Sequence, residues 1–462
     1  MSLLSQIGMS GARASQIAMT VTGQNVANVK TPGFSRLGTE MGSLSGHTAL
    51  SSGRGVQVNN IRRIADDFVN RQLWRATSEN GLNASQQQYL GALEGLMASE
   101  GSNISGGLDN FFAALNATTS TPDSIGLRQQ VLNEAKALAL RFNGLSNNIE
   151  RQLGALREQR GAIVTELNGL TDNIAQLNKR ITQVEASNGD AKALRDQRDS
   201  LVQSLAELAD VRVGEAADGS FSISLANGQP LVAGTTAGVV SLTTGVDNEQ
   251  DFSLKFAGTD FPMAKDGFGA KLGGLYRAEY DSLRASQQII SQIAGEVANK
   301  FNTALAAGFD LGTPVGTPPF ASGVPLFDYD PTSKSQPLKV FDLRPEQLAF
   351  SSMDDEVGNN QNLLALIKLK NDPVTVDGTV TTLNDAYATL LGRVASTSRQ
   401  GQADLDTAKG VLSQAQAQRD SISAVNLDEE GVNLMNYQQA YQANLKVIST
   451  AGELFDSLLA IF

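Results

Sequence analysis

The chain has 462 residues, which is too long for one ordinary hydrophobic core, so we expect two to four domains. It has no cysteine and a single histidine, His47, and this excludes disulfides, thiolate chemistry and most zinc sites. The formal net charge of -12, without a basic stripe, argues against a nucleic-acid partner. The N-terminus lacks a basic segment before its apolar stretch, and no run of about 18 apolar residues occurs, so we predict neither a cleaved signal peptide nor a membrane span.

The N-terminal segment is predicted to form an amphipathic helix over residues 2–28, ending before the breaker cluster at 30–33. Its stripe of small and apolar side chains steps by three and four residues. We predict this stripe as one half of an assembly interface, formed by Leu4, Ile7, Ala14, Ala18, Val21, Asn25 and Asn28.

The middle of the chain carries longer helical patterns. Residues 127–186 repeat apolar side chains every seven positions, which predicts a long helix with a coiled-coil face. Residues 61–98 and 383–424 have helical spacing as well, and we interpret the three segments as an antiparallel helical rod. The heptad positions are Ala135, Phe142, Ile149, Leu156, Ile163, Leu170, Leu177 and Val184.

A β-rich insertion is predicted next, because residues 210–275 contain short extended runs separated by turn signals. The dipeptides Asp218-Gly219 and Asn227-Gly228 are typical of hairpin turns. A helix is expected again at 277–306. The Pro- and Gly-rich stretch 310–358 is expected to pack back on the β insertion.

The C-terminus returns to a helical seam that continues to the last residue. Residues 1–36 contain three basic side chains and no acid, whereas residues 428–462 contain five acidic side chains and one lysine, so the two ends are expected to pair. Two paired helices leave much of their surface exposed to water. We therefore expect both ends of the chain to become ordered only when neighbouring copies cover them. The predicted C-terminal interface residues are Leu434, Tyr441, Leu445, Ile448, Phe455, Leu459 and Phe462.

Short motifs at both ends resemble the flagellar rod, hook and hook-associated protein family. The N-terminal segment 25–36 resembles the signature of that family, and segments 426–430 and 437–444 resemble its C-terminal motif. Inner segments narrow the resemblance to hook-associated members that join the hook to the filament. These inner segments are 111–115, 194–199 and 297–302.

The resemblance implies a structural subunit of the extracellular flagellum that assembles into a ring of copies of itself between hook and filament. It also implies unfolded export through the type III apparatus, contact with the hook protein and with hook-associated protein 3, and an export chaperone that holds the C-terminal segment. Alternatives remain another axial component, such as a hook or distal-rod subunit, and a surface adhesin that acts through the β insertion.

The expected fold class is mainly α with a β insertion, built from terminal coiled-coil helices, an elongated helical bundle and a small inserted β domain. The terminal helical pair comprises 1–36 and 427–462. The helical rod comprises 37–209, 277–309 and 359–426. The β-rich outer domain comprises 210–276 together with 310–358.

Enzyme chemistry has little support in the sequence, so we expect no catalytic residue, no cofactor and no metal site. His47 lies in a polar loop and is interpreted as a surface residue. The glycines at 267–274 fit neither dinucleotide nor Walker spacing. Asp328 and Asp330 alternate like calcium ligands, but Pro331 follows and no glutamate stands at the distance that a calcium loop requires.

Overall fold

A computed structural model of the chain describes residues 3–45, 53–312, 315–316 and 320–461. His47 lies outside the described residues. Contacts divide the chain into two compact units, of which unit 1 comprises residues 1–80, 164–270 and 408–462. Unit 2 comprises residues 81–163 and 271–407. The predicted fold class is confirmed, since long helices dominate and every sheet is a small antiparallel one.

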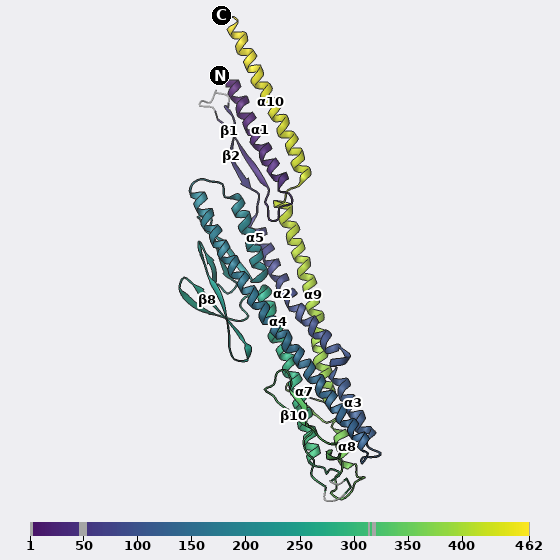
Figure 1. Ribbon diagram of the computed structural model, residues 1–462. Coiled ribbons are helices and arrows are strands. Elements are labelled where there is room, and N and C mark those ends of the chain that lie inside the picture. Colours follow the sequence, from purple (N-terminus) through teal and green to yellow (C-terminus); the bar gives the residue numbers. More distant parts are fainter. Residues whose placement is uncertain (1–2, 46–52, 313–314, 317–319, 462) are drawn as a thin grey trace. The chain divides into compact units, whose positions relative to one another are not determined.

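Unit 1 contains both ends of the chain (Figure 1). Helix α1 spans Leu3–Ala27, and α10 spans Leu427–Leu459. The hairpin β1 (Leu37–Leu44) and β2 (Gly55–Arg63) follows α1 in the chain and contacts it. The unit also holds α5 (Lys192–Leu208), the beginning of α2 (Asp67–Ala98), the end of α4 (Ile125–Ala186) and the end of α9 (Leu383–Ser423).

The predicted β insertion is present in unit 1 as two separate sheets. One sheet pairs its strands in the order β3 (Val211–Glu215), β4 (Phe221–Leu225), β5 (Pro230–Ala233) and β6 (Thr236–Ala237). The other has β7 (Val239–Thr244), β8 (Gln250–Phe256) and β9 (Thr259–Met263). Gly219 and Gly228 adopt positive φ of 78° and 90° in the two turns that the sequence predicts.

Unit 2 is a helical assembly with two short hairpins. Its helices are α3 (Ile104–Ala117), α6 (Ala270–Arg277), α7 (Ala285–Ala306) and α8 (Gln361–Lys368), with the π-helix η3 (Ala278–Arg284) between α6 and α7. The hairpins pair β10 (Phe327–Tyr329) with β11 (Leu338–Val340), and β12 (Val374–Val376) with β13 (Thr379–Thr381). Four aromatic rings in tilted and edge-to-face contact form a core cluster, namely Phe111, Phe112, Phe301 and Phe327.

The long helix predicted at 127–186 is confirmed as α4. Its heptad residues from Ala135 to Ile163 are all buried, which explains why the seven-residue pattern persists. A Cβ added at Gly144, Gly154 or Gly169 would meet no atom within 4 Å, so these glycines lie on open helix surface.

The helix predicted at 61–98 is wrong at its start. Strand β2 continues to Arg63, and α2 begins only at Asp67. Asp66 sets this boundary, because its carboxylate accepts hydrogen bonds from the backbone N–H groups of Phe68 and Val69 at 2.8 and 3.2 Å. Phe68, in the first turn of α2, is 67% exposed.

The segment 310–358 belongs to unit 2, whereas 210–270 belongs to unit 1. Within unit 2, β10 and β11 contact α7, and the Arg128 guanidinium donates to the carbonyl of Leu348 at 2.5 Å. The sequence predicts 210–276 and 310–358 as one outer domain, whereas the contacts assign 210–270 and 310–358 to different units. The boundaries of the three-part division stay a prediction.

Helix-borne asparagines hold strands and extended segments to helices throughout both units. In each case the side-chain amide donates to the carbonyl of one residue and its oxygen accepts from the N–H of the same residue. This reproduces the hydrogen bonding of a neighbouring strand and satisfies buried backbone groups. The pairs are Asn25–Leu37, Asn143–Leu338, Asn168–Val240, Asn178–Phe221 and Asn302–Phe327.

Candidate assembly interface

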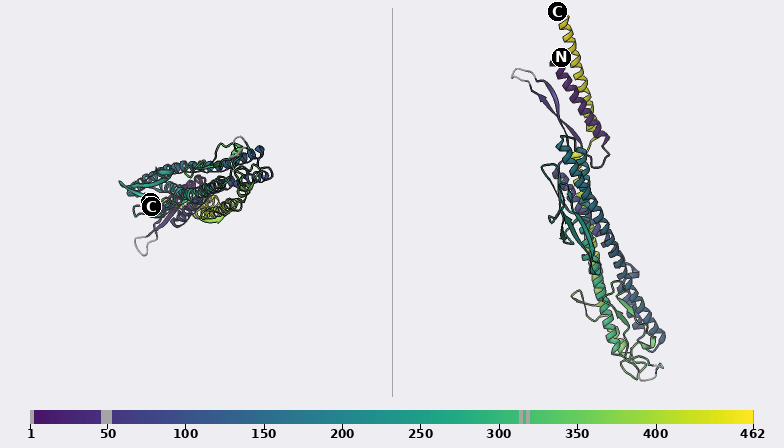
Figure 2. Two further views of the ribbon diagram at one scale, coloured as in Figure 1. Left: turned by 90° about the horizontal axis from the view of Figure 1, so that it is seen from below. Right: turned by 60° about the vertical axis from the view of Figure 1, so that its left-hand side comes forward.

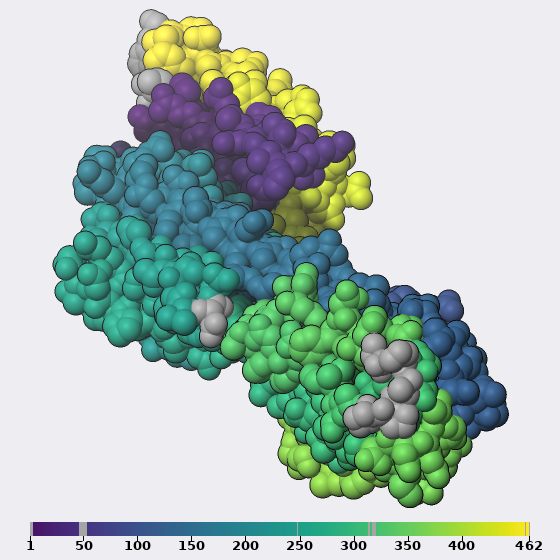
Figure 3. Space-filling model, turned by 60° about the horizontal axis from the view of Figure 1, so that its bottom comes forward, coloured from purple at the N-terminus to yellow at the C-terminus, as the bar shows by residue number. Residues whose placement is uncertain are grey.

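Helices α1 and α10 lie side by side in unit 1, as both ribbon views show (Figures 1 and 2). The N-terminal and C-terminal segments adjoin in the space-filling view as well (Figure 3). Pairing of the two chain ends, expected from their charges and seams, is therefore present in the single chain. The buried positions of α1 are mostly small, namely Gly8, Gly11, Ala12, Ala14, Ser15, Ala18, Val21, Thr22 and Asn25.

Two glycines let the helix axes approach closely. A Cβ at Gly8 would lie 2.8 Å from Cγ1 of Ile448 and 3.1 Å from the carbonyl oxygen of Asn444. A Cβ at Gly11 would lie 2.3 Å from the side-chain oxygen of Asn444. By contrast, a Cβ at Gly23 would meet nothing within 4 Å. Gly8 is thus required by the packing of α1 on α10, a Cβ at Gly11 would displace the end of the Asn444 side chain, and Gly23 is not constrained.

The structure places the predicted α1 residues in three different environments. Ala14, Ala18 and Val21 are buried, and Ile7 and Asn28 are half-buried. Leu4 is exposed. Asn25 is buried, but its amide is fully engaged with Leu37 of β1, at 2.9 Å in both directions.

The predicted interface residues of α10 fall into a half-buried group and an exposed group, which the sequence does not distinguish. Tyr441 and Ile448 are half-buried. Leu434, Leu445, Phe455 and Leu459 are exposed, and Phe462 lies outside the described residues. The more buried side of α10 is instead formed by mixed polar and small side chains, namely Glu430, Asn433, Tyr437, Tyr441, Asn444, Ile448 and Ala451.

The exposed apolar side chains of the two helices are numerous for a protein surface. On α1 they are accompanied by small residues, and on α10 they extend over the whole length of the helix. We call this set the terminal apolar surface; it consists of Leu3, Leu4, Met9, Ile17, Val26, Leu427, Val432, Leu434, Met435, Leu445, Leu454, Phe455 and Leu459.

Among the described residues, complementary charge at the two ends is used in one ion pair. The Arg36 guanidinium lies 2.6 Å from the Glu429 carboxylate, with 25% and 59% of these side chains exposed. The backbone N–H of Arg36 donates to the carbonyl of Ser423, and Arg419 donates to the carbonyl of Gly33, both near the start of α10. Arg13 and Lys30 have no hydrogen-bond or ion-pair partner for their side chains in the described part of the chain.

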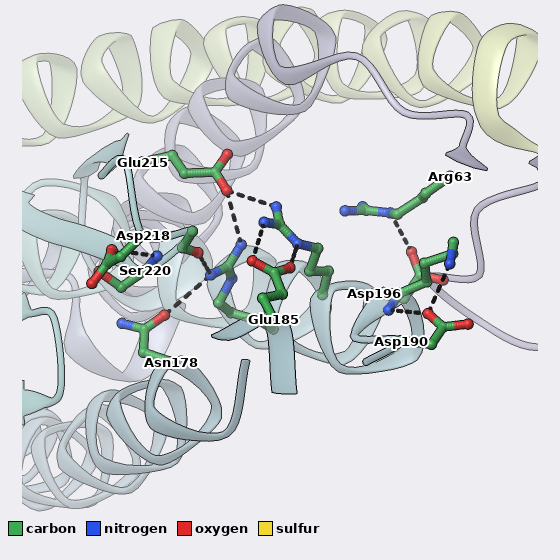
Figure 4. A network of polar contacts seen from close by, with 12 residues as sticks. Arg63, Asn178, Glu185, Asp190, Asp196, Glu215, Asp218 and Ser220 are labelled. Atoms are coloured by element: carbon green, nitrogen blue, oxygen red, sulfur yellow. Dashed lines mark hydrogen bonds and ion pairs between the residues drawn. The ribbon is translucent and has the colours of Figure 1, made fainter. Parts of the chain in front are cut away.

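A buried polar network anchors β2 and the loop after α1 to helix α5 (Figure 4). Arg63 contacts the carboxylates of both Asp196 and Asp199, and the N–H of Ser35 donates to Asp196 at 3.2 Å. Burial opposes the charge of Arg63, yet the two carboxylates outweigh it and raise its pKa. The arrangement locks this hairpin to α5.

The two arginines of the same α5 motif bind elsewhere in unit 1. Arg195 forms ion pairs with Glu185 and Glu215, at 2.8 and 2.6 Å. Burial lowers the pKa of Arg198 to about 10, and its guanidinium stacks 3.3 Å from the ring centre of Phe221. The motif at 194–199, which carries part of the family resemblance, thus supplies structural ion pairs.

Neither a metal site nor a membrane-spanning helix is found among the described residues. No three histidine, aspartate or glutamate side chains there gather so that they could hold a metal ion. No helix in the same residues has both the length and the apolar character needed to cross a bilayer. Gly267 and Gly269 lie in the connection from β9 to α6, where Gly269 has φ of 59°, and Gly273 and Gly274 lie within α6.

Most of the middle of the chain matches a known protein family. The model described as "Flagellar hook-associated protein FlgK helical domain" matches residues 90–320. The chain belongs to the FlgK family of flagellar hook-associated proteins. Two further flagellar models match this FlgK-family chain at its ends, a basal body rod model at residues 6–34 and a rod protein C-terminal model at residues 416–461.

Curated relatives match this FlgK-family chain over its length. It is 26% identical to flagellar hook-associated protein 1 of Salmonella typhimurium and of Escherichia coli, with all of both chains covered. It is 25% identical to the Bacillus subtilis protein of the same name, covering 96% of this chain and 95% of that one. The resemblance inferred from the sequence is confirmed, and the chain is a structural protein of the bacterial flagellum.

A solved structure shows the same fold. The flagellar hook junction protein FlgK from Burkholderia pseudomallei matches with a TM-score of 0.68 at 16% identity, covering 76% of this chain and 100% of that one.

Proposed function

We propose that this FlgK-family chain is the subunit of the junction between flagellar hook and filament, and that it assembles with copies of itself through its terminal helices. The terminal apolar surface carries this proposal, because large apolar side chains on both helices have no cover in the single chain. Neighbouring copies that pack against α1 and α10 would remove these side chains from water.

The energetics favour order on assembly. Full burial of one large apolar side chain contributes about 1.5–3 kcal/mol. Fixing the backbone of one residue costs about 1–2 kcal/mol. In the isolated chain only the small-residue face of α1 and the polar face of α10 are covered, so the terminal helices gain most of their stability when copies join.

The remaining partners follow from the same role. The subunit is expected to contact the hook protein on one side and hook-associated protein 3 on the other. It is expected to leave the cell unfolded through the type III apparatus, with a chaperone on its C-terminal segment. Its role is structural rather than enzymatic, and the terminal pair 1–36 and 427–462 forms the assembly domain.

The proposal is tested with a strain that lacks the gene and carries plasmid-borne variants. Leu445→Gln combined with Phe455→Gln makes two exposed α10 positions polar. We expect this variant to be secreted but to leave cells with hooks, without filaments, and with flagellin in the medium. Leu140→Gln changes a 71% exposed leucine of α4 and is the matched control.

Loss of hooks in the deletion strain would instead identify a hook or rod subunit. Normal motility of the α10 double variant would overturn the proposed interface.

A further inference from the structure

A cavity of 240 Å³ lies in unit 1 between α1, the start of β1 and the first turns of α10. Val21 and Thr22 of α1 line one side, and Glu430, Asn433 and Tyr437 of α10 line another. Because about 10–15 Å³ suffices for one water, the cavity has room for the end of a long side chain and several waters.

The polar groups of this cavity are unequally satisfied. Arg36 and Glu429, both in the lining, form their ion pair with each other. Glu430 is only 3% exposed, and within the described residues no hydrogen bond or ion pair reaches its carboxylate. The side chains of Thr22, Asn433 and Tyr437 likewise have no hydrogen-bond partner in those parts of the chain. The cavity therefore presents a carboxylate without a bonded partner, beside free neutral groups and the unbonded Nε of Arg36, whose Nη1 is bound to Glu429.

The carboxylate of Glu430 opens on the cavity, and a carboxylate confined in this way is normally compensated by a cation or by hydrogen bonds. The first turn of α10 compensates it only in part, through the positive end of the helix dipole. A long basic side chain would meet the requirement fully, because its stem could lie along Val21 and its head could bind Glu430.

We propose that this cavity is a socket for a basic side chain of a second copy of the chain, whose cationic head pairs with Glu430 in the assembled state. This inference rests on the proposed self-assembly. It names the polar contact that would fix the position of one copy against the next. The chain itself supplies suitable donors. Residues 1–36 hold Arg13, Lys30 and Arg36 without any acid, and Arg36 is already bound to Glu429. Arg13 and Lys30 are exposed, and each can reach outward from unit 1.

The first test uses the full-length Glu430→Gln subunit, which keeps the shape of the side chain but removes its charge. Labelled subunits are titrated onto isolated hooks, and the concentration at half-saturation is measured. We expect it to rise at least about tenfold, while the melting temperature of the free subunit stays unchanged or rises. Asp428→Asn removes the same charge from an exposed position two residues away and should bind like the wild type. Wild-type binding by the Glu430→Gln subunit would overturn the proposal.

The second test is a charge swap within the same chain. Glu430→Lys should abolish hook binding, and adding either Lys30→Glu or Arg13→Glu should restore at least a third of it. Restoration by one of these identifies the donor, and restoration by neither overturns the proposal.

The Leu445→Gln and Phe455→Gln double variant distinguishes failure of the proposed self-assembly from failure of the proposed socket. If it still binds hooks, self-assembly through α10 fails; if it does not bind while Glu430→Gln binds normally, only the socket fails.

Discussion

Asn25 of α1 and Leu37 of β1 form a closed pair of hydrogen bonds, in which the asparagine amide donates to the leucine carbonyl and accepts from its N–H, both at 2.9 Å. Asn25 is 1% exposed and Leu37 is 9% exposed, so water cannot replace these bonds. The first residue of the hairpin is thereby fixed to the helix that precedes it. The asparagine acts as a structural link within the chain, although its place in the helical stripe predicted an intermolecular contact.

Asn25→Leu should therefore detach β1 from α1. Two buried backbone groups of Leu37 lose their partner, and each such group costs about 1–3 kcal/mol. We expect the Leu37 amide to lose most of its protection in hydrogen exchange. Asn28→Leu is the control, because among the described residues the Asn28 side chain bonds only near neighbours, donating to the carbonyl of Gln24 and accepting from the hydroxyl of Thr31. Equal protection of Leu37 in the Asn25→Leu variant and the wild type would contradict the pairing.

The glycine positions of α1 give opposite expectations for the same substitution. Gly8→Ala places a methyl group 2.8 Å from Ile448, so α10 must move away and the helix pair should lose stability. Gly23→Ala meets nothing within 4 Å and should stabilise α1 by about 0.5–1 kcal/mol. Circular dichroism and proteolysis of the two purified variants would compare them. A gain of similar size in both would show that α1 and α10 are not closely packed.

The sequence predicted the structure well where all residues of a repeating pattern lie in the same environment, such as a buried helix face. Helix α4 shows this, because its heptad residues such as Phe142 and Ile149 are fully buried and repeat without interruption. The hairpin of β1 and β2 was missed because its residues are largely glycine, serine and polar side chains. The bonds that fix it join Asn25 with Leu37, Ser10 with Val56, and Arg63 with Asp196. Such links join residues far apart in the chain and leave no periodic signal.

The face of α10 that packs on α1 was not identified from the sequence, for a related reason. Hydrophobic spacing selects the largest apolar residues, such as Leu445 and Phe455, and both are exposed in the single chain. The face beside α1 uses small and polar groups, such as Asn444 and Ala451, which match the glycines and alanines opposite. A sequence pattern cannot distinguish an apolar side chain that packs within a chain from one that would pack between chains.

Arg63 provides a sharp test of the buried network. Arg63→Met leaves Asp196 and Asp199 without their shared cation, and removing one partner from a buried ion pair typically costs about 3–5 kcal/mol. Its neighbour Arg62 contacts Glu40 at 3.5 Å with both side chains largely exposed, so Arg62→Met should cost no more than about 1 kcal/mol. Urea unfolding of both variants measures the difference. Similar losses in the two would mean that the Arg63 network does not hold unit 1 together.

Tyr387 predicts a loss of stability in alkali. Its hydroxyl is buried and donates to the carbonyl of Met97 at 2.9 Å, and burial raises its pKa to about 12 from the usual 10.0. The folded state thus favours the neutral phenol. This contribution is complete below pH 10 and disappears as the pH rises towards about 12. Tyr387→Phe should lose about 0.5–1.5 kcal/mol near neutral pH but should show a shallower decline above pH 10. Parallel pH profiles for the variant and the wild type would contradict the assignment.

Hydrogen exchange of the terminal helices, compared between free subunits and subunits assembled on hooks, tests the central claim most directly. If copies cover the terminal apolar surface, the amides of α1 and α10 should exchange quickly in the free subunit and become strongly protected on assembly. Protection that is already complete in the free subunit, and that does not change when subunits join the hook, would contradict assembly through these helices.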